Sequence, residues 1–232
     1  MARVRSNFFG ISGKLGDKVY KIMNGKTYVA RLPEKFTLPM DAASVERRKK
    51  FSLCVKLAHS INKIPAFHYV WKKYLRTTNV PGKIIKEIYS RITPDDISNL
   101  NLTPRINFLC NVKSLVFTPG KITIVFLPLG QKTEIWEPAE GQIALHGVLT
   151  LINKDADVKL RHLCIPLSSE YQKTDLVNEM TFELMLPALV EDRLADYPFI
   201  ALHTALATID LDGNAVKVSI QCYNEISNPE FH

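Results

Sequence analysis

The chain has 232 residues with an ordinary apolar fraction of 46%, which excludes bulk disorder and allows one large domain or two small ones. No run of about 18 apolar residues occurs and no apolar segment follows the basic N-terminus, so we expect neither a membrane span nor a secretory signal. Residues 1–112 carry 21 Lys and Arg against 7 Asp and Glu, whereas residues 113–232 carry 9 against 16. Net charges of +14 and −7 indicate two surfaces with different partners.

The first predicted element is a β-hairpin. Residues 18–23 and 26–31 alternate polar and apolar side chains around Asn24-Gly25. Because both central residues of a type I′ turn need a positive φ, Asn-Gly between two such runs is a strong hairpin signal. The turn would place Met23 opposite Lys26.

Three glycines precede this hairpin at a period of three, namely Gly10, Gly13 and Gly16. They would allow tight turns or a close backbone approach. A phosphate-binding loop is the alternative, but the segment lacks the Gly-Lys-Ser/Thr ending of such loops and no buried strand precedes it.

A cluster of helices is predicted next. Asp41 is a good N-cap for a helix from Ala42 to about Asn62, in which apolar residues recur at helical spacing. Pro65 would end this helix and begin a second, and Pro81 would begin a third. Residues 93–96, Thr-Pro-Asp-Asp, are typical of a further N-cap and first helical turn.

From residue 106 onward the apolar period changes to two. We expect strands near residues 106–118, 121–128, 142–152, 160–168, 177–186, 198–210 and 214–224. This spacing is typical of an antiparallel β-sandwich of the immunoglobulin or fibronectin kind, although the cysteine–tryptophan–cysteine pattern of true immunoglobulin domains is missing. The predicted class is therefore α+β, with a basic β-hairpin arm (residues 1–40), a helical segment (41–104) and a β-sandwich domain (105–232).

The sequence contains no recognisable catalytic or metal-binding pattern. The histidines show no HExxH or related spacing, and neither a GxSxG elbow nor a catalytic cysteine context occurs. The four cysteines are widely spaced in apolar runs, which favours free thiols over disulfides. Two alternatives remain open, a metal site formed by strand histidines (His146, His162, His203) and a calcium site at turn aspartates (Asp155, Asp157, Asp210, Asp212). We expect a non-enzymatic protein with no cofactor, metal ion or small-molecule substrate.

The basic and aromatic first half carries the main functional signal. Basic residues interleaved with aromatics occur in protein interfaces and in nucleic-acid sites, and a solvated face with a few core aromatics is the third interpretation. The candidate binding residues are Lys14, Lys18, Tyr20, Lys21, Lys26, Tyr28 and Arg31 around the hairpin, and Arg47, Arg48, Lys49 and Lys50 on the first helix. As a helical run, the last four would point around the whole cylinder.

Residues 8–60 resemble a known family. The segment Gly13-Lys14-Leu15-Gly16, the strand Gly25-Lys26-Thr27-Tyr28-Val29-Ala30-Arg31-Leu32-Pro33 and the helix ending in Arg48-Lys49-Lys50-Phe51 match, in order and spacing, an uncharacterised family common in Bacteroidota. Leu38-Pro39 departs from that family's Asn-Pro before the helix. No activity is established for the family, so the resemblance implies only a layout, in which a basic N-terminal part precedes a β-sandwich-like region.

These features favour a structural or assembly protein. The hairpin of one subunit would bind an exposed sheet edge of a neighbour, as in a phage virion component or a self-assembling filament or shell. The expected partners are other copies of the chain or other assembly proteins, and the alternative is nucleic-acid binding by the basic half. The protein is expected to be made in the cytoplasm and incorporated into a virion or another assembly.

Overall fold

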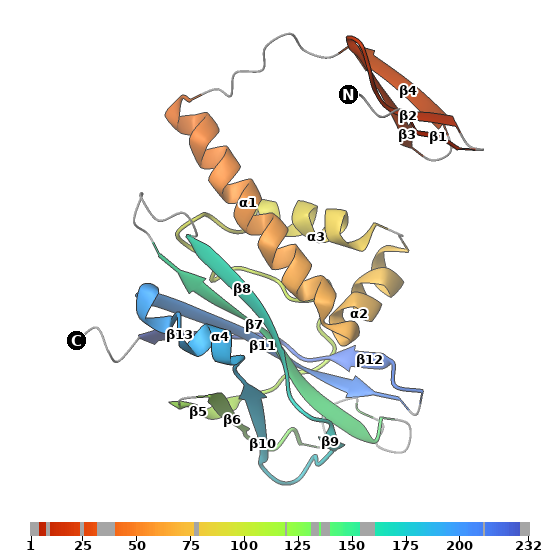
Figure 1. The fold of residues 1–232 in the computed structure, drawn as a ribbon. Helices are drawn as coiled ribbons and strands as arrows, with labels where there is room; N and C mark the ends of the chain where they lie inside the picture. The colour runs from red at the N-terminus through yellow and green to blue at the C-terminus, as the bar shows by residue number, and fades with distance from the viewer. Residues whose placement is uncertain are drawn as a thin grey trace. The chain divides into compact units, whose positions relative to one another are not determined.

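The computed structural model describes residues 5–7, 10–23, 26–31, 40–76, 79–118, 120–130, 135, 140–153, 161–210 and 212–227. The chain divides into two compact units, Met1–Val45 and Glu46–His232 (Figure 1). We call them the arm and the body.

The arm contains a four-stranded antiparallel meander in the order β1-β2-β3-β4. Its strands are β1 (Arg5–Asn7), β2 (Gly10–Leu15), β3 (Lys18–Met23) and β4 (Lys26–Arg31). The predicted hairpin is confirmed, with Met23 opposite Lys26, whereas its Asn-Gly turn lies outside the described residues. Gly13 lies within β2, and Gly16 has a φ of 58° at the turn into β3. The glycines thus serve a strand and a turn, so the phosphate-loop alternative is wrong.

Three helices follow, α1 (Ala42–Lys63), α2 (Pro65–Leu75) and α3 (Val80–Tyr89). Asp41 caps α1 as predicted, because its Oδ2 accepts a hydrogen bond of 2.9 Å from the backbone N–H of Ser44. Pro65 occupies the first turn of α2. The predicted helical start at residues 93–96 is wrong, since Thr93 Oγ1 accepts from the Asp96 N–H in a turn that no helix follows.

A six-stranded antiparallel sheet forms the centre of the body. It contains β7 (Gln142–Ile152), β8 (His162–Ser168), β9 (Gln172–Lys173), β11 (Phe199–Ile209), β12 (Ala215–Val218) and β13 (Cys222–Ser227). The central strands β7 and β11 pair over their full length. β8 and β9 pair with the other side of β7, and β12 and β13 with the other side of β11. The single strand predicted over residues 214–224 is therefore two strands.

A smaller antiparallel sheet has the order β10-β6-β5. Its strands are β5 (Val112–Thr118), β6 (Lys121–Phe126) and β10 (Met180–Met185). Two short helical turns, α4 (Ala188–Glu191) and η1 (Leu194–Asp196), connect β10 to β11. The strand predicted over residues 106–118 begins only at Val112, because Phe108 forms no more than an isolated bridge with Ser219.

The six-stranded sheet is buried on both faces. Helix residues such as Phe67, Trp71 and Ile84 share one apolar cluster with Val148 and Ala205 of the sheet. A second cluster joins the opposite face of that sheet to the three-stranded sheet, with members including Leu149, Leu202, Ile124, Phe126 and Phe182. Figure 1 shows the helices on one side of β7 and β11, and β5, β6 and β10 on the other.

This layering confirms the α+β class and the antiparallel sheets, but it does not confirm an immunoglobulin-like sandwich. The prediction treats the helices as a segment preceding the β domain, whereas the helices share a core with the sheet. The division into an arm, a helical segment and a sandwich domain at residues 40 and 104 stays a prediction.

Candidate protein interface

The register of the arm gives its sheet two different faces. Directly opposite residues share a face, and successive residues alternate between faces. Lys14 pairs with Val19 and Lys21 pairs with Tyr28, so both pairs lie on one side together with Lys26. Lys14, Lys21, Lys26 and Tyr28 are all exposed. We call these four residues the basic face.

The opposite face of the arm is mostly apolar. Tyr20 pairs with Val29, and Ile22 and Lys18 lie on the same side of β3 as Tyr20. Val29 is 56% exposed, and Tyr20 and Ile22 are half-buried. We call Tyr20, Ile22 and Val29 the apolar face. Lys18 and Arg31 lie opposite each other at its end, where Arg31 is 3.8 Å from the Asp17 carboxylate.

The arm's described side chains form no core. Every one for which burial is described, from Gly13 to Arg31, is half-buried or exposed. Three or more strands are independently stable when they have an apolar face that is covered. The apolar face of the arm is thus available for contact with another surface.

The four basic residues predicted on the first helix lie outside the arm sheet, on the first half of α1. Arg47 is exposed, and Arg48, Lys49 and Lys50 are half-buried. The Lys50 ammonium lies 4.7 Å from the centroid of the Tyr89 ring, which is a cation–π contact within the body. Lys50 therefore has a role in packing α1 against α3.

Helix α1 covers part of the sheet edge formed by β8. In an antiparallel sheet alternate residues turn their N–H and C=O groups to opposite sides. The Asn153 N–H donates to the Arg161 carbonyl, so Arg161 turns its backbone groups toward β7. By alternation, His162 does not, and neither does Cys164, so the N–H and C=O groups of both residues point away from β7. Those outward carbonyls accept from Lys56 Nζ at 2.8 Å and Ser60 Oγ at 2.9 Å, both on α1. Pro166, at the next outward position, has no N–H to offer.

Two further edges are also protected. The Val218 carbonyl and N–H, which point outward from β12, bond to the Asn107 N–H at 2.8 Å and to Asn107 Oδ1 at 3.1 Å. The register of β5 shifts between Val112 and Ser114, and Lys113 there forms an ion pair of 2.7 Å with Glu179. Bulges and edge lysines are both known to discourage the addition of a strand.

The edge formed by β13 has no such cover among the described residues. The Ser219 N–H donates to the Leu206 carbonyl, so the even-numbered residues of β11 turn their backbone groups toward β12 and β13. Leu202 therefore bonds to its partner Asn224, and the neighbouring residues Tyr223 and Glu225 turn their N–H and C=O groups outward. Among the described residues no hydrogen bond closes these outward groups.

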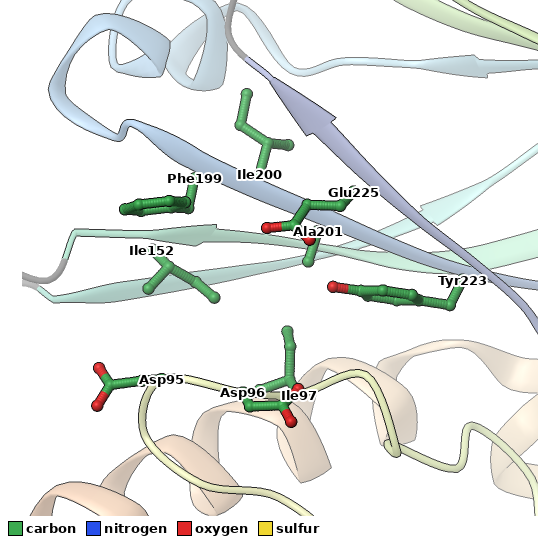
Figure 2. A pocket seen from close by; sticks show the side chains of 9 residues that line it. All are labelled: Asp95, Asp96, Ile97, Ile152, Phe199, Ile200, Ala201, Tyr223 and Glu225. Atoms are coloured by element: carbon green, nitrogen blue, oxygen red, sulfur yellow. The ribbon is translucent and has the colours of Figure 1, made fainter.

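An acidic pocket adjoins this open edge (Figure 2). It has a volume of about 220 Å³, and its charged side chains are Asp95, Asp96 and Glu225. Figure 2 shows Asp95 and Asp96 on the loop that faces β11, with Tyr223 and Glu225 on β13. The pKa of Asp96 is lowered because its carboxylate accepts from the Ser98 N–H. The pKa of Tyr223 is raised by burial and then by the negative charges of Glu225 and Asp96. The pocket beside this edge is therefore negatively charged.

The buried histidines serve the core of the body. His146 Nδ1 lies 2.9 Å from Ser168 Oγ, His162 Nε2 lies 2.8 Å from the Pro94 carbonyl, and the His203 ring centroid lies 4.8 Å from that of Tyr223. Burial lowers the pKa of all three imidazoles, to about 4 for His146 and His203. No group of three metal-binding side chains occurs in the described part of the chain.

The cysteines and turn aspartates also have structural roles. All four cysteines are free thiols, two buried and two half-buried, as the sequence predicts apart from the exposure of Cys164 and Cys222. Asp210 Oδ1 accepts from the N–H groups of Asp212 and Asn214, which is Asx-turn chemistry. Asp155 and Asp157 lie outside the described residues.

Seven of the eleven residues predicted to bind a partner lie on the arm sheet, where they are divided between its two faces. The β13 edge, with Tyr223 and Glu225, was not among the predicted sites. The predicted strand over residues 214–224 includes Tyr223, but a strand pattern does not reveal whether a neighbouring segment covers the strand.

No helix in the described ranges has the length and hydropathy needed to cross a bilayer. In comparisons with known proteins, neither a family model nor a curated protein matches this chain.

Proposed function

We propose that this chain is a non-enzymatic structural subunit whose arm binds a neighbouring subunit in an assembly. The supporting observation is the lack of a core among the arm's described side chains, although Tyr20, Ile22 and Val29 gather on one face. A sheet buries its apolar face against another layer. A second copy or another assembly protein would supply that layer, in a phage virion or in a self-assembling filament or shell.

The proposal is tested by changing the apolar face in the full chain. Val29→Asp should weaken self-association about tenfold or more, because it places a charge in the contact. Val177→Asp is the matched control, since Val177 is also exposed, at 72%, but lies on a turn of the body. Light scattering after size exclusion, over a range of concentrations, measures the difference.

Removal of residues 1–35 gives the extreme case. The body keeps both of its apolar clusters without the arm, so the truncated chain should stay folded and monomeric. If the truncated chain assembles as the full chain does, or if the full chain is monomeric at every concentration, the proposal is wrong.

Nucleic-acid binding is a second candidate, and the basic face is the observation that favours it. Three lysines and Tyr28 lie together on one exposed side of the arm. Lysines that follow a phosphate backbone beside an aromatic ring that stacks on bases are typical of single-strand binding.

Salt dependence tests this second candidate. The triple change of Lys14, Lys21 and Lys26 to Gln should reduce the slope of log affinity against log salt by roughly 2 for a single-stranded oligonucleotide. The same triple change at the exposed Lys72, Lys83 and Lys86 of α2 and α3 removes equal charge and should leave the slope nearly unchanged. Absence of binding by the full chain at about 50 mM salt contradicts this candidate.

A further inference from the structure

We infer that the arm docks on the open β13 edge of a second copy, where β4 adds to the six-stranded sheet as a further strand. This inference rests on the proposed assembly function and names the surface that receives the arm. Strand addition gives affinity through main-chain hydrogen bonds, and adjacent side chains give it specificity.

Among the described residues, two edges of the body, β13 and β10, turn unbonded backbone groups outward. Charge points to β13, because Glu183 of β10 is paired with Lys121, whereas Glu225 of β13 lies in a pocket whose charged residues are all acidic. The outward carbonyls of His162 and Cys164 in β8 are bonded to α1, the outward groups of Val218 in β12 are bonded to Asn107, and β5 carries a bulge. At β13 the backbone groups of Tyr223 and Glu225 face outward, and none is bonded to a described residue. An edge whose N–H and C=O groups are unpaired is a template for another strand.

The arm presents a strand that fits this edge. Its sheet ends in β1, with 3 residues, and in β4, with 6 residues, and β13 also has 6 residues. All six side chains of β4 are exposed. A pairing of β4 with β13 would therefore use the full length of both strands.

Charge complementarity sets the orientation of this pairing. Residues 10–31 carry five Lys and Arg against one Asp. The charged residues of the pocket beside β13 are all acidic. Directly opposite residues on paired strands share a face, so one register places Lys26, and with it the basic face, on the side of Glu225 and Asp96. In the same register Val29, on the apolar face of the arm, lies on the other side of the extended sheet, away from these carboxylates.

The resulting contact is head-to-tail, because each copy offers an arm and an edge that differ from one another. Such heterologous contacts generate closed rings or open filaments.

A charge swap between two full chains tests the inference. Lys26→Glu puts an acid against an acidic edge, and Glu225→Lys puts a base against a basic arm, so each variant alone should self-associate at least about tenfold more weakly. In an equimolar mixture, the arm of the first variant meets Lys at position 225 of the second, and the arm of the second meets the native Glu225 of the first. Both contacts are then complementary, and the mixture should assemble while neither variant does so alone.

Matched controls come from two exposed residues of opposite charge on α3. Lys83→Glu and Glu87→Lys change the charge by the same amounts on another exposed surface of the body. They should leave self-association unchanged, alone and mixed. A general effect of net charge would instead alter these variants as much as the Lys26 and Glu225 variants.

Three results would overturn the inference. If the native chain assembles but mixing the two variants restores nothing, the arm docks elsewhere, and the proposed function survives. If the two changes compensate each other only when one chain carries both, and that chain is a monomer, the arm binds its own body. If the native chain does not assemble at all, the proposed function fails together with the inference.

Hydrogen exchange gives an independent readout of strand addition. On assembly of the native chain, the amides of Tyr223 and Glu225 should exchange about tenfold or more slowly, because they gain main-chain partners. The amide of Asn224 already faces β11 and serves as the internal reference. Assembly without added protection at Tyr223 and Glu225 would contradict docking at this edge.

Discussion

The arm and the body are both built from antiparallel strands, but their strands are buried very differently. All six residues of β4 are exposed, whereas ten of the eleven residues of β11 are buried. β11 pairs with strands on both of its sides, and β4 pairs with β3 on one side. The comparison shows that pairing alone makes a strand, and that the layers above and below decide whether the strand contributes a core.

Their sequences reflect this difference. β11 reads Phe-Ile-Ala-Leu-His-Thr-Ala-Leu-Ala-Thr-Ile, a nearly continuous apolar run, because helices cover one face and the three-stranded sheet covers the other. β3 and β4 mix lysine, threonine and arginine with apolar residues. The arm is therefore suited to a surface that it meets outside its own sheet.

The largest expected effect is the loss of a core side chain from the body. Trp71 is 1% exposed, and its indole N–H donates to the Leu102 carbonyl at 2.8 Å. Trp71→Ala should lower the free energy of unfolding by about 3–5 kcal/mol, because it leaves a cavity and an acceptor without its donor. Urea unfolding followed by circular dichroism measures this loss.

Tyr74→Ala on the same helix is the control for that prediction. Tyr74 is 58% exposed, so its removal should change the free energy of unfolding by less than about 1 kcal/mol. Equal losses for Trp71 and Tyr74 would mean that the helices do not pack on the sheet as described.

Acid should destabilise the body through its buried histidines. In the folded state the pKa of His146 and that of His203 are lowered to about 4 by burial, whereas an unfolded histidine titrates near 6.5. Between these pH values the unfolded chain binds protons that the folded chain does not, so stability is lost as pH falls from about 6.5 to about 4. Each histidine should contribute on the order of 3 kcal/mol to this loss.

The slope of stability against pH, from denaturant unfolding at several pH values, checks this prediction. His203→Gln should make the slope shallower by about one proton, whatever its effect at neutral pH. His59→Gln, at an exposed position of α1, is the matched control. A slope that is the same in both variants would mean that His203 is not held neutral by burial.

The smallest expected effect on stability comes from the arm. Tyr28 is 49% exposed, so Tyr28→Ala should change the free energy of unfolding of the body by no more than about 0.5 kcal/mol. Both tryptophans lie in the body, so their fluorescence reports on it alone. The same change should weaken self-association, because Tyr28 lies on the basic face. A large loss of stability would mean that the arm is part of the body's core.

Local signals alone determined much of the secondary structure. The Asn-Gly dipeptide fixed the hairpin and the pairing of Met23 with Lys26, because a two-residue turn leaves one register available. Asp41 and Pro65 marked helix starts, because capping and the missing proline N–H act within one turn. The strands of the body were predicted from their alternation or apolar runs, including both central strands.

Only the tertiary structure decided which surfaces are covered and which are open. Phe51 fits the predicted apolar stripe of α1 but is 53% exposed, because the packed part of the helix begins at Leu53. β8 and β13 are both short strands at an edge of the sheet, and their sequences do not show which edge is covered. Lys56 and Ser60 on α1 donate to carbonyls of β8, although they lie more than 100 residues away along the chain. Long-range contacts of this kind leave no periodic trace in the sequence, so the open edge beside Tyr223 and Glu225 could be found only in three dimensions.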